Sequence, residues 1–126
     1  MSNAQVIRNF NEDGTLEEKY FVINDQKHGK YKQYYENGGI LMECEYVNGI
    51  KNGPYYEYYE DGTVYVSCNY VNNLKNGEYI EYHQNGKIFE KMTYVNDVLN
   101  GLYEGYSEDG ILEETTTYVN DVIVEN

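Results

Sequence analysis

The side chains of this sequence that could do chemistry are two cysteines, two histidines and a recurring set of carboxylates. Cys44 and Cys68 could form a disulfide or supply a thiolate, and His28 and His83 could act as bases or bind a metal. The carboxylates lie beside Asn-Gly or Asp-Gly pairs, where oxygen ligands could hold a cation: Glu12, Asp13, Glu36, Glu60, Asp61, Glu108 and Asp109. Whether any of them act together depends on the elements that position them.

Glycine positions show how the chain is organised, because most glycines recur at an interval of 24 residues. One series is Gly14, Gly38, Gly62, Gly86 and Gly110, and a second is Gly29, Gly53, Gly77 and Gly101. The repeat predicts five units, at about residues 5–28, 29–52, 53–76, 77–100 and 101–126. Residues 1–4 contain Ser-Asn-Ala, and we expect them to be either a remnant of a purification tag or a disordered start. The repeats then form one domain over residues 5–126.

Most tyrosines follow the same interval. The three columns are Tyr31, Tyr55, Tyr79 and Tyr103; Tyr34, Tyr58, Tyr82 and Tyr106; and Tyr46, Tyr70, Tyr94 and Tyr118. Val-Asn follows each member of the third column. The first unit is the most diverged, with Ile7, Phe10 and Val22 at the three tyrosine positions.

Each unit reads as a β-hairpin. The Asn-Gly or Asp-Gly pair, such as Asp61-Gly62, predicts a two-residue type I′ turn. The second connection, such as residues 48–53, is longer and leads to the next hairpin, but it is too short for a parallel crossover. The sequence therefore predicts an all-β protein: an elongated, single-layer antiparallel meander of stacked hairpins with about ten strands.

The pattern G-x-Y-x-x-Y-x-x-[ND]-G-x-[LIV], closing with Y-V-N, resembles the MORN repeat, and more closely its bacterial variant, over about residues 5–124. The resemblance implies a scaffold for protein or membrane contact, and such bacterial proteins often carry an antitoxin or immunity-like label. Other members inherit a lipid-kinase label from kinases that contain the repeat. We reject that label here, because the sequence has no G-x-G-x-x-G loop, V-A-I-K lysine, H-R-D or D-F-G set.

The composition limits the classes of partner that the protein can bind. The 126 residues include 22 acidic and 9 basic side chains, with a formal charge of -13. This charge disfavours nucleic acid and anionic membranes and favours a basic protein partner. No apolar run approaches the roughly 18–20 residues of a membrane span, the start is not a signal peptide, and two cysteines indicate no disulfide framework. We expect a cytoplasmic protein.

The predicted register assigns two faces to the sheet. If Asp61-Gly62 is a strict two-residue loop, one apolar core face contains Tyr55, Tyr59, Val64, Val66, Cys68 and Tyr70. A strand bulge would change this assignment. On the opposite face Tyr34 pairs with Leu41, Tyr58 with Tyr65 and Tyr82 with Phe89. These three pairs form an aromatic band across the middle of that face. Phe10 then faces Glu17 and Tyr106 faces Glu113, which makes the predicted band acidic at both ends. The predicted partner-binding residues are Tyr34, Leu41, Tyr56, Tyr58, Tyr65, Tyr82 and Phe89. The alternative is that these tyrosines only pack on cross-strand neighbours.

This arrangement leaves no catalytic, metal-binding or cofactor-binding residues to predict. Cys44 and Cys68 occupy one column of successive hairpins, roughly 9.5 Å apart, which is too far for a disulfide. His28 and His83 lie two repeats apart, and stacked turns separate the carboxylates by about 9–10 Å. We therefore expect no enzyme but a protein-interaction scaffold, antitoxin-like by resemblance. The alternatives are a homo-oligomer formed through exposed edge strands or stacked faces, and a membrane-surface module.

Overall fold

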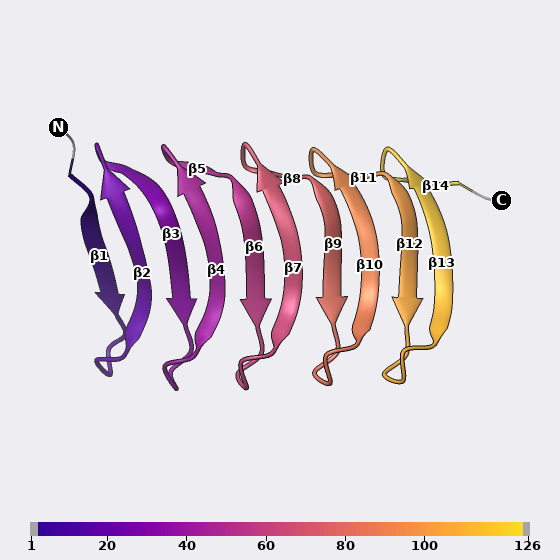
Figure 1. The fold of residues 1–126 in the computed structure, drawn as a ribbon, viewed down its shortest axis with the longest axis horizontal. Coiled ribbons are helices and arrows are strands. Elements are labelled where there is room, and N and C mark those ends of the chain that lie inside the picture. The colour runs from indigo at the N-terminus through magenta and orange to yellow at the C-terminus, as the bar shows by residue number, and fades with distance from the viewer. Residues whose placement is uncertain (1–2, 125–126) are drawn as a thin grey trace.

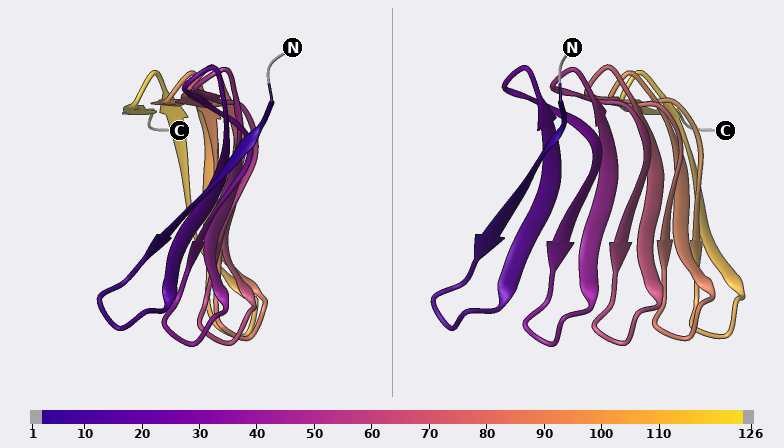
Figure 2. Two further views of the ribbon diagram at one scale, coloured as in Figure 1. Left: turned by 90° about the vertical axis from the view of Figure 1, so that its left-hand side faces the viewer. Right: turned by 60° about the vertical axis from the view of Figure 1, so that its left-hand side comes forward.

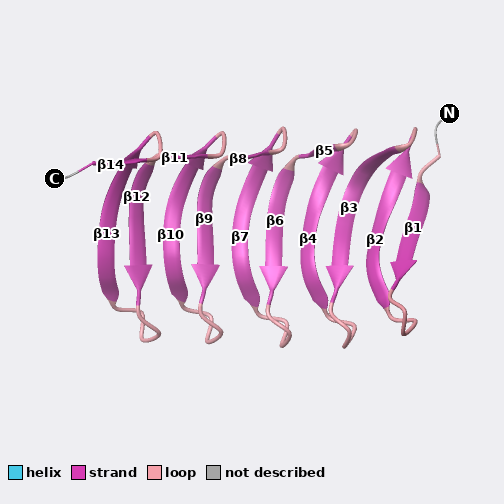
Figure 3. Cartoon of the chain, turned by 180° about the vertical axis from the view of Figure 1, so that it is seen from behind, coloured by secondary structure: helices cyan, strands magenta, loops and turns pink. Residues whose placement is uncertain are grey.

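The computed structural model describes residues 3–124 and shows them as one open antiparallel sheet (Figures 1 and 3). Its long strands are β1 (Gln5–Phe10), β2 (Leu16–Ile23), β3 (Gln26–Tyr34), β4 (Ile40–Val47), β6 (Gly53–Tyr58), β7 (Val64–Val71), β9 (Gly77–Tyr82), β10 (Ile88–Val95), β12 (Gly101–Tyr106) and β13 (Leu112–Val119). The short strands are β5 (Ile50–Lys51), β8 (Leu74–Lys75), β11 (Val98–Leu99) and β14 (Val122–Val124). The predicted fold class is confirmed, although the short strands raise the strand count to 14.

The strands follow one another in chain order, so each hairpin contacts only the hairpins beside it (Figure 1). The sheet is a single layer, and strand twist accumulates from the first hairpin to the last (Figure 2). Its accessible surface is 8016 Å², whereas a compact monomer of this mass exposes about 7,000 Å². No helix in residues 3–124 is long and apolar enough to cross a bilayer. The expected tag remnant at residues 1–4 stays a prediction, and residues 1 and 2 lie outside the described part.

One face of the sheet contains the core. We call the face that carries Tyr31, Tyr55 and Tyr79 the tyrosine face, and the opposite face, which carries Tyr34, Tyr58 and Tyr82, the band face. The buried apolar side chains of the described residues are Tyr31, Cys44, Val66 and Met92, and all of them lie on the tyrosine face. The predicted core side is therefore confirmed, except that Val64, which was expected there, pairs with Tyr58 on the band face.

The turns at the lower edge in Figure 1 are longer than predicted. In the second complete unit the Tyr59 N–H donates to the Thr63 carbonyl over 2.8 Å, and the Gly62 N–H donates to the Tyr59 carbonyl over 2.9 Å. Only Gly62 has positive φ, at 91°. The loop is thus a type I turn followed by a glycine bulge, not a type I′ turn. Asp61 stabilises it by accepting hydrogen bonds from the Thr63 N–H and hydroxyl, at 2.9 and 2.6 Å.

A second irregularity in each hairpin compensates for the longer turn. Tyr58 pairs with Val64, but Glu57 pairs with Val66, so Tyr65 is an extra, bulged residue. Beyond it Tyr55 pairs with Cys68, as predicted. The expected register is therefore right in the strand interiors and wrong beside the turns. All five hairpins share the shift, and the bulged residues are Glu17, Leu41, Tyr65, Phe89 and Glu113.

Tight turns lie at the upper edge, where a longer connection was expected. Asn72 and Asn73 both have positive φ, at 52° and 70°, and Val71 pairs with Leu74 across them. This is the two-residue type I′ geometry that the other edge lacks. The Asn of each Val-Asn motif therefore forms the turn because it tolerates the left-handed conformation.

The last three upper turns each dock on the hairpin before them through two hydrogen bonds, and the turn at Gly49 does so through one, from the Gly49 N–H to the Lys27 carbonyl. The Asn73 N–H donates to the Lys51 carbonyl, and the Asn73 Oδ1 atom accepts from the Lys51 N–H, both over 2.8 Å. Asp97 makes the same two bonds to Lys75, and Asp121 makes them to Leu99. These paired bonds fix the spacing of successive hairpins at the upper edge.

A second set of contacts joins the hairpins near the lower edge, where the ladder between hairpins opens. The Tyr35 hydroxyl donates to the Tyr58 carbonyl and the Tyr59 hydroxyl to the Tyr82 carbonyl, each over 2.5 Å. The His83 Nε2 atom lies 3.1 Å from the Tyr106 carbonyl oxygen. His83 thus occupies a structural position shared with two tyrosines.

Lysines cover the tyrosine rings at the upper end of the tyrosine face. The Nζ atom of Lys51 lies 5.4 Å from the Tyr55 ring centroid and 4.6 Å from that of Tyr70. Lys27 and Lys75 stand over the equivalent rings. Each such contact stabilises the sheet by about 0.5–1 kcal/mol where it is exposed. Lys27, Lys51 and Lys75 recur at the same 24-residue interval as the glycines and tyrosines.

These buried tyrosines make stability depend on alkaline pH. Burial, and then the hydrogen bond to Glu18, raises the pKa of Tyr31 from 10.0 to about 12. Burial also raises the pKa of Tyr70 to about 12. Because the unfolded chain loses these protons first, the stabilisation is complete below about pH 10 and is lost as pH rises toward about 12. We expect the urea midpoint to fall steeply over this range, while tyrosinate absorbance of the folded protein appears late. A constant midpoint contradicts the assignment.

Candidate functional site

The bulges change the composition of the predicted aromatic band. Tyr34 pairs with Ile40, Tyr58 with Val64 and Tyr82 with Ile88, so the predicted pairs with Leu41, Tyr65 and Phe89 are wrong. In the outer hairpins Phe10 pairs with Leu16 and Tyr106 with Leu112. The band therefore crosses all five hairpins without acidic ends. We define the band as Phe10, Leu16, Tyr34, Ile40, Tyr58, Val64, Tyr82, Ile88, Tyr106 and Leu112.

The bulged residues project toward the tyrosine face instead. The Tyr65 ring centroid lies 5.0 Å from that of Tyr59, and the Tyr65 hydroxyl hydrogen-bonds Glu81, whose backbone pairs with Val66. The Phe89 ring lies 4.9 Å from His83, and Leu41 lines a hollow with Gln33 and Tyr35. Glu17 and Glu113 occupy the same bulged position. Of the seven predicted site residues, the structure brings Tyr34, Tyr56, Tyr58 and Tyr82 together on the band face.

The centre of the band face is aromatic and partly buried. The Tyr56 and Tyr58 ring centroids lie 6.3 Å apart, and the Tyr58 hydroxyl donates to Glu43 Oε1 over 2.7 Å. Burial, and then this bond to Glu43, raises the pKa of Tyr58. Tyr58 is therefore a neutral donor at physiological pH, with an apolar ring available for contact.

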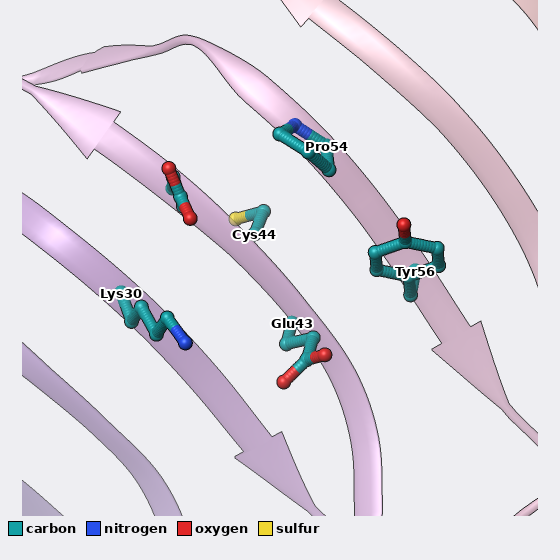
Figure 4. Close-up of a pocket in the computed structure, with 6 residues that line it drawn as sticks. Lys30, Glu43, Cys44, Pro54 and Tyr56 are labelled. Carbon is teal, nitrogen blue, oxygen red and sulfur yellow. The ribbon is translucent and has the colours of Figure 1, made fainter.

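Shallow hollows follow the band face from β2 to β9. One lies over β2 and β3, lined by Lys19, Phe21, Lys30 and Lys32. The next, drawn in Figure 4, is lined by Lys30, Glu43, Cys44, Glu45, Pro54 and Tyr56. The third continues across β6, β7 and β9, lined by Pro54, Tyr56, Val64, Ser67, Cys68, Asn69, Glu78, Ile80 and Tyr82. Pro54 and Tyr56 belong to two hollows, so these form a continuous surface.

The charges of the molecule are distributed unequally between its surfaces. The cations placed on the band face by strand pairing are Arg8, Lys19, Lys30, Lys32 and Lys91, and the carboxylates are Glu43, Glu45, Glu78 and Glu104. Most of the chain's 22 acidic residues lie on the tyrosine face or in the turns. The band face is thus close to neutral on a protein of charge -13. It combines apolar side chains, hollows and low net charge.

The residues that could do chemistry have structural partners. Cys44 and Cys68 are free thiols, and burial raises the pKa of Cys68 to about 11, which leaves little thiolate. His28 Nδ1 lies 3.2 Å from the Asn48 backbone nitrogen, which donates to it. Hydrogen bonds from Thr15 and Thr63 lower the pKa values of Asp13 and Asp61. Within residues 3–124, no three His, Cys, Asp or Glu side chains are arranged to hold a metal ion.

Comparison with known proteins agrees with the repeat geometry. A family model described as a MORN repeat variant matches residues 27–48, 51–72, 75–96 and 99–120. These ranges recur at the 24-residue interval, and the diverged first hairpin lies outside them. A search of curated proteins gives no match. Because the matches cover well over half of the chain and coincide with its hairpins, the chain belongs to the MORN repeat variant family.

Proposed function

We propose that this protein is a non-enzymatic scaffold that recognises a partner protein through its band face. MORN repeats in general are protein- or membrane-interaction motifs. The observation that carries the proposal is the band itself, which presents apolar side chains from all five hairpins on a nearly neutral face. Aromatic residues beside shallow hollows are the usual anchors of protein interfaces.

The alternative roles have less support. A membrane surface rich in anionic lipid would meet the acidic turns at both edges of the sheet. Self-association would rest on exposed apolar residues of the last hairpin, such as Ile111 at 63% and Val122 at 64% exposure. The antitoxin or immunity-like role that the resemblance implies is a narrower form of our proposal, in which the partner is a toxin.

The test compares two matched double variants in affinity capture from the native host's lysate. Tyr58→Ser/Tyr82→Ser removes two band residues, and Tyr65→Ser/Phe89→Ser removes aromatic rings from the same two hairpins on the opposite face. We expect the first variant to weaken partner binding at least about thirtyfold, as loss of an interface anchor does. The second should bind within about threefold of wild type.

Folding and oligomeric state are measured on the same samples. Both variants must show the wild-type circular dichroism spectrum, and light scattering must report whether the wild type is a monomer. Capture of the same proteins by all three forms contradicts recognition through the band. A concentration-dependent oligomer with no captured partner supports self-association instead.

A further inference from the structure

The band face carries a row of cations on its first two hairpins. Arg8 on β1 pairs with Lys19 on β2, and Lys19 pairs with Lys32 on β3. Paired residues share a face and adjacent strands lie about 4.8 Å apart, so the three backbone positions span about 10 Å. Lys30, two residues before Lys32 on β3, lies on the same face and pairs with Glu45. Four of the nine basic residues of the chain are therefore gathered in one small area.

Two carboxylates face this cluster, because Glu43 pairs with Lys32 and Glu45 pairs with Lys30, but neither lies within 4.0 Å of a cluster cation. Like charges directly opposite each other on a sheet repel and destabilise it. An acidic residue at one of these positions would remove the repulsion, and the chain contains 22 acidic residues. The next residue of the row, Glu43, accepts the Tyr58 hydroxyl. Among residues 3–124, the one ion pair within 4.0 Å joins Lys91 to Glu78, at 3.9 Å and outside the cluster. With four cations and two facing carboxylates, the cluster retains a net positive charge.

A hollow gives the cluster a shape. Lys19, Phe21, Lys30 and Lys32 line it, and the Lys19 Nζ atom lies 5.8 Å from the Phe21 ring centroid. An apolar ring among amines suits a ligand group that has methylene carbons as well as negative charge, such as a glutamate side chain. The hollow is continuous through Lys30 with the next one on the band face.

We propose that Arg8, Lys19, Lys30 and Lys32 form a subsite that binds an acidic segment of the partner protein, beside the apolar band. This inference rests on the proposed function and adds to it the orientation of the partner on the band face. The partner places carboxylates over β1–β3 and apolar side chains over β4–β10. The net charge predicted a basic partner, but most of the negative charge lies away from the band face.

The same charge distribution favours a short acidic segment over other anions. A bilayer or a long nucleic acid would extend past the cluster to the turn carboxylates, such as Glu12, Asp13 and Glu36, and be repelled there. A peptide can occupy the band face without approaching those turns. The partner class is therefore an acidic protein segment.

The test measures binding of fluorescein-labelled hexaglutamate by fluorescence anisotropy in low-salt buffer. Lys19→Gln/Lys32→Gln removes two cluster cations, and Lys51→Gln/Lys75→Gln removes two cations from the tyrosine face, giving the same net charge. We expect the first variant to raise the Kd at least about tenfold and to flatten its salt dependence. The second should stay within about twofold of wild type.

Several outcomes overturn the proposal. The first is that the wild type does not bind hexaglutamate, and the second is that both folded variants bind it equally weakly. The third is that phosphatidylserine vesicles or a single-stranded DNA oligonucleotide bind more tightly than the peptide. The capture assay then separates the two proposals. Partner capture that needs Tyr58 and Tyr82 but not Lys19 and Lys32 removes the subsite and keeps the proposed function. The opposite outcome is that Lys19→Gln/Lys32→Gln loses hexaglutamate binding while the band variant captures the partner normally. That outcome keeps the anion subsite and removes recognition through the band.

Discussion

Deletion of residues 53–76 is expected to leave a protein that folds and unfolds cooperatively, whereas deletion of residues 53–64, half as many, should leave one that does not fold. The longer deletion removes one whole hairpin, β6 and β7. Asn52 then precedes Gly77 just as Asn76 does now, so the connection keeps its local sequence. In a repeat protein with only nearest-neighbour contacts, the loss is one unit and one interface.

The contacts at the new junction have ready substitutes. Tyr35 can donate to the Tyr82 carbonyl in place of that of Tyr58, because the hairpins are related by the repeat. Asp97 can make with Lys51 the two bonds that it now makes with Lys75. We expect the circular dichroism spectrum to keep its shape while the urea midpoint falls.

The shorter deletion removes β6 and the first residue of β7 but keeps the rest of β7, which must then run in the opposite direction beside β4. The side chains of Cys68 and Tyr70 lose their partners across the hairpin, Tyr55 and Gly53. Every later hairpin is inverted relative to the first two. Equal urea midpoints for the two deletions, or loss of folding in both, would contradict the nearest-neighbour account.

We expect Val66→Asp to reduce the free energy of unfolding by at least about 4 kcal/mol, a large share of the roughly 5–15 kcal/mol typical of a domain. Val66 is 1% exposed, the most buried side chain of the described residues. Its cross-strand neighbours are Glu57 and Glu81, so a carboxylate there is desolvated and repelled by two others. Burial together with the neighbouring Glu90 already raises the pKa of Glu81.

The matched control is Val71→Asp, on the same strand. Val71 is 38% exposed beside an upper turn, and we expect a change within about 0.5 kcal/mol. The pKa of the aspartate at position 66 is raised in the folded state, so its penalty should shrink as pH falls through that raised value. Urea unfolding at neutral and mildly acidic pH measures both effects. Similar midpoints for the two variants would show that the tyrosine face does not hold the core.

The sequence predicted the repeat, the meander and the core side because glycine and tyrosine spacing is set by the same contacts in every hairpin. It did not predict the register beside the lower turns. An Asp-Gly pair suits both a two-residue turn and a three-residue loop, since each places glycine at positive φ. The second bulge restores the interior register, so Tyr55 pairs with Cys68 whichever turn is present, and this pair does not distinguish the two turns.

A sequence signal for the bulge did exist. The position of Val64 is aliphatic in every unit, as Leu16, Ile40, Ile88 and Leu112 show, whereas the next position varies from Glu17 to Phe89. The uniform column is the one that completes the band, and the variable one is the bulge. The interior register that the sequence predicts already pairs Arg8 with Lys19, but Lys32 joins them only through the pairing between β2 and β3, which the sequence did not define.

The single-layer meander also determines how the molecule responds to tension. The first and last hairpins lie at opposite ends of the sheet, and the hydrogen bonds between hairpins run along the line that joins them (Figure 1). A pull along that line opens these bonds one after another instead of shearing many at once. Each hairpin that peels away releases 24 residues, roughly 80 Å of extended chain. A partner attached at both ends of the sheet would therefore be held by an extensible tether that lengthens in uniform steps.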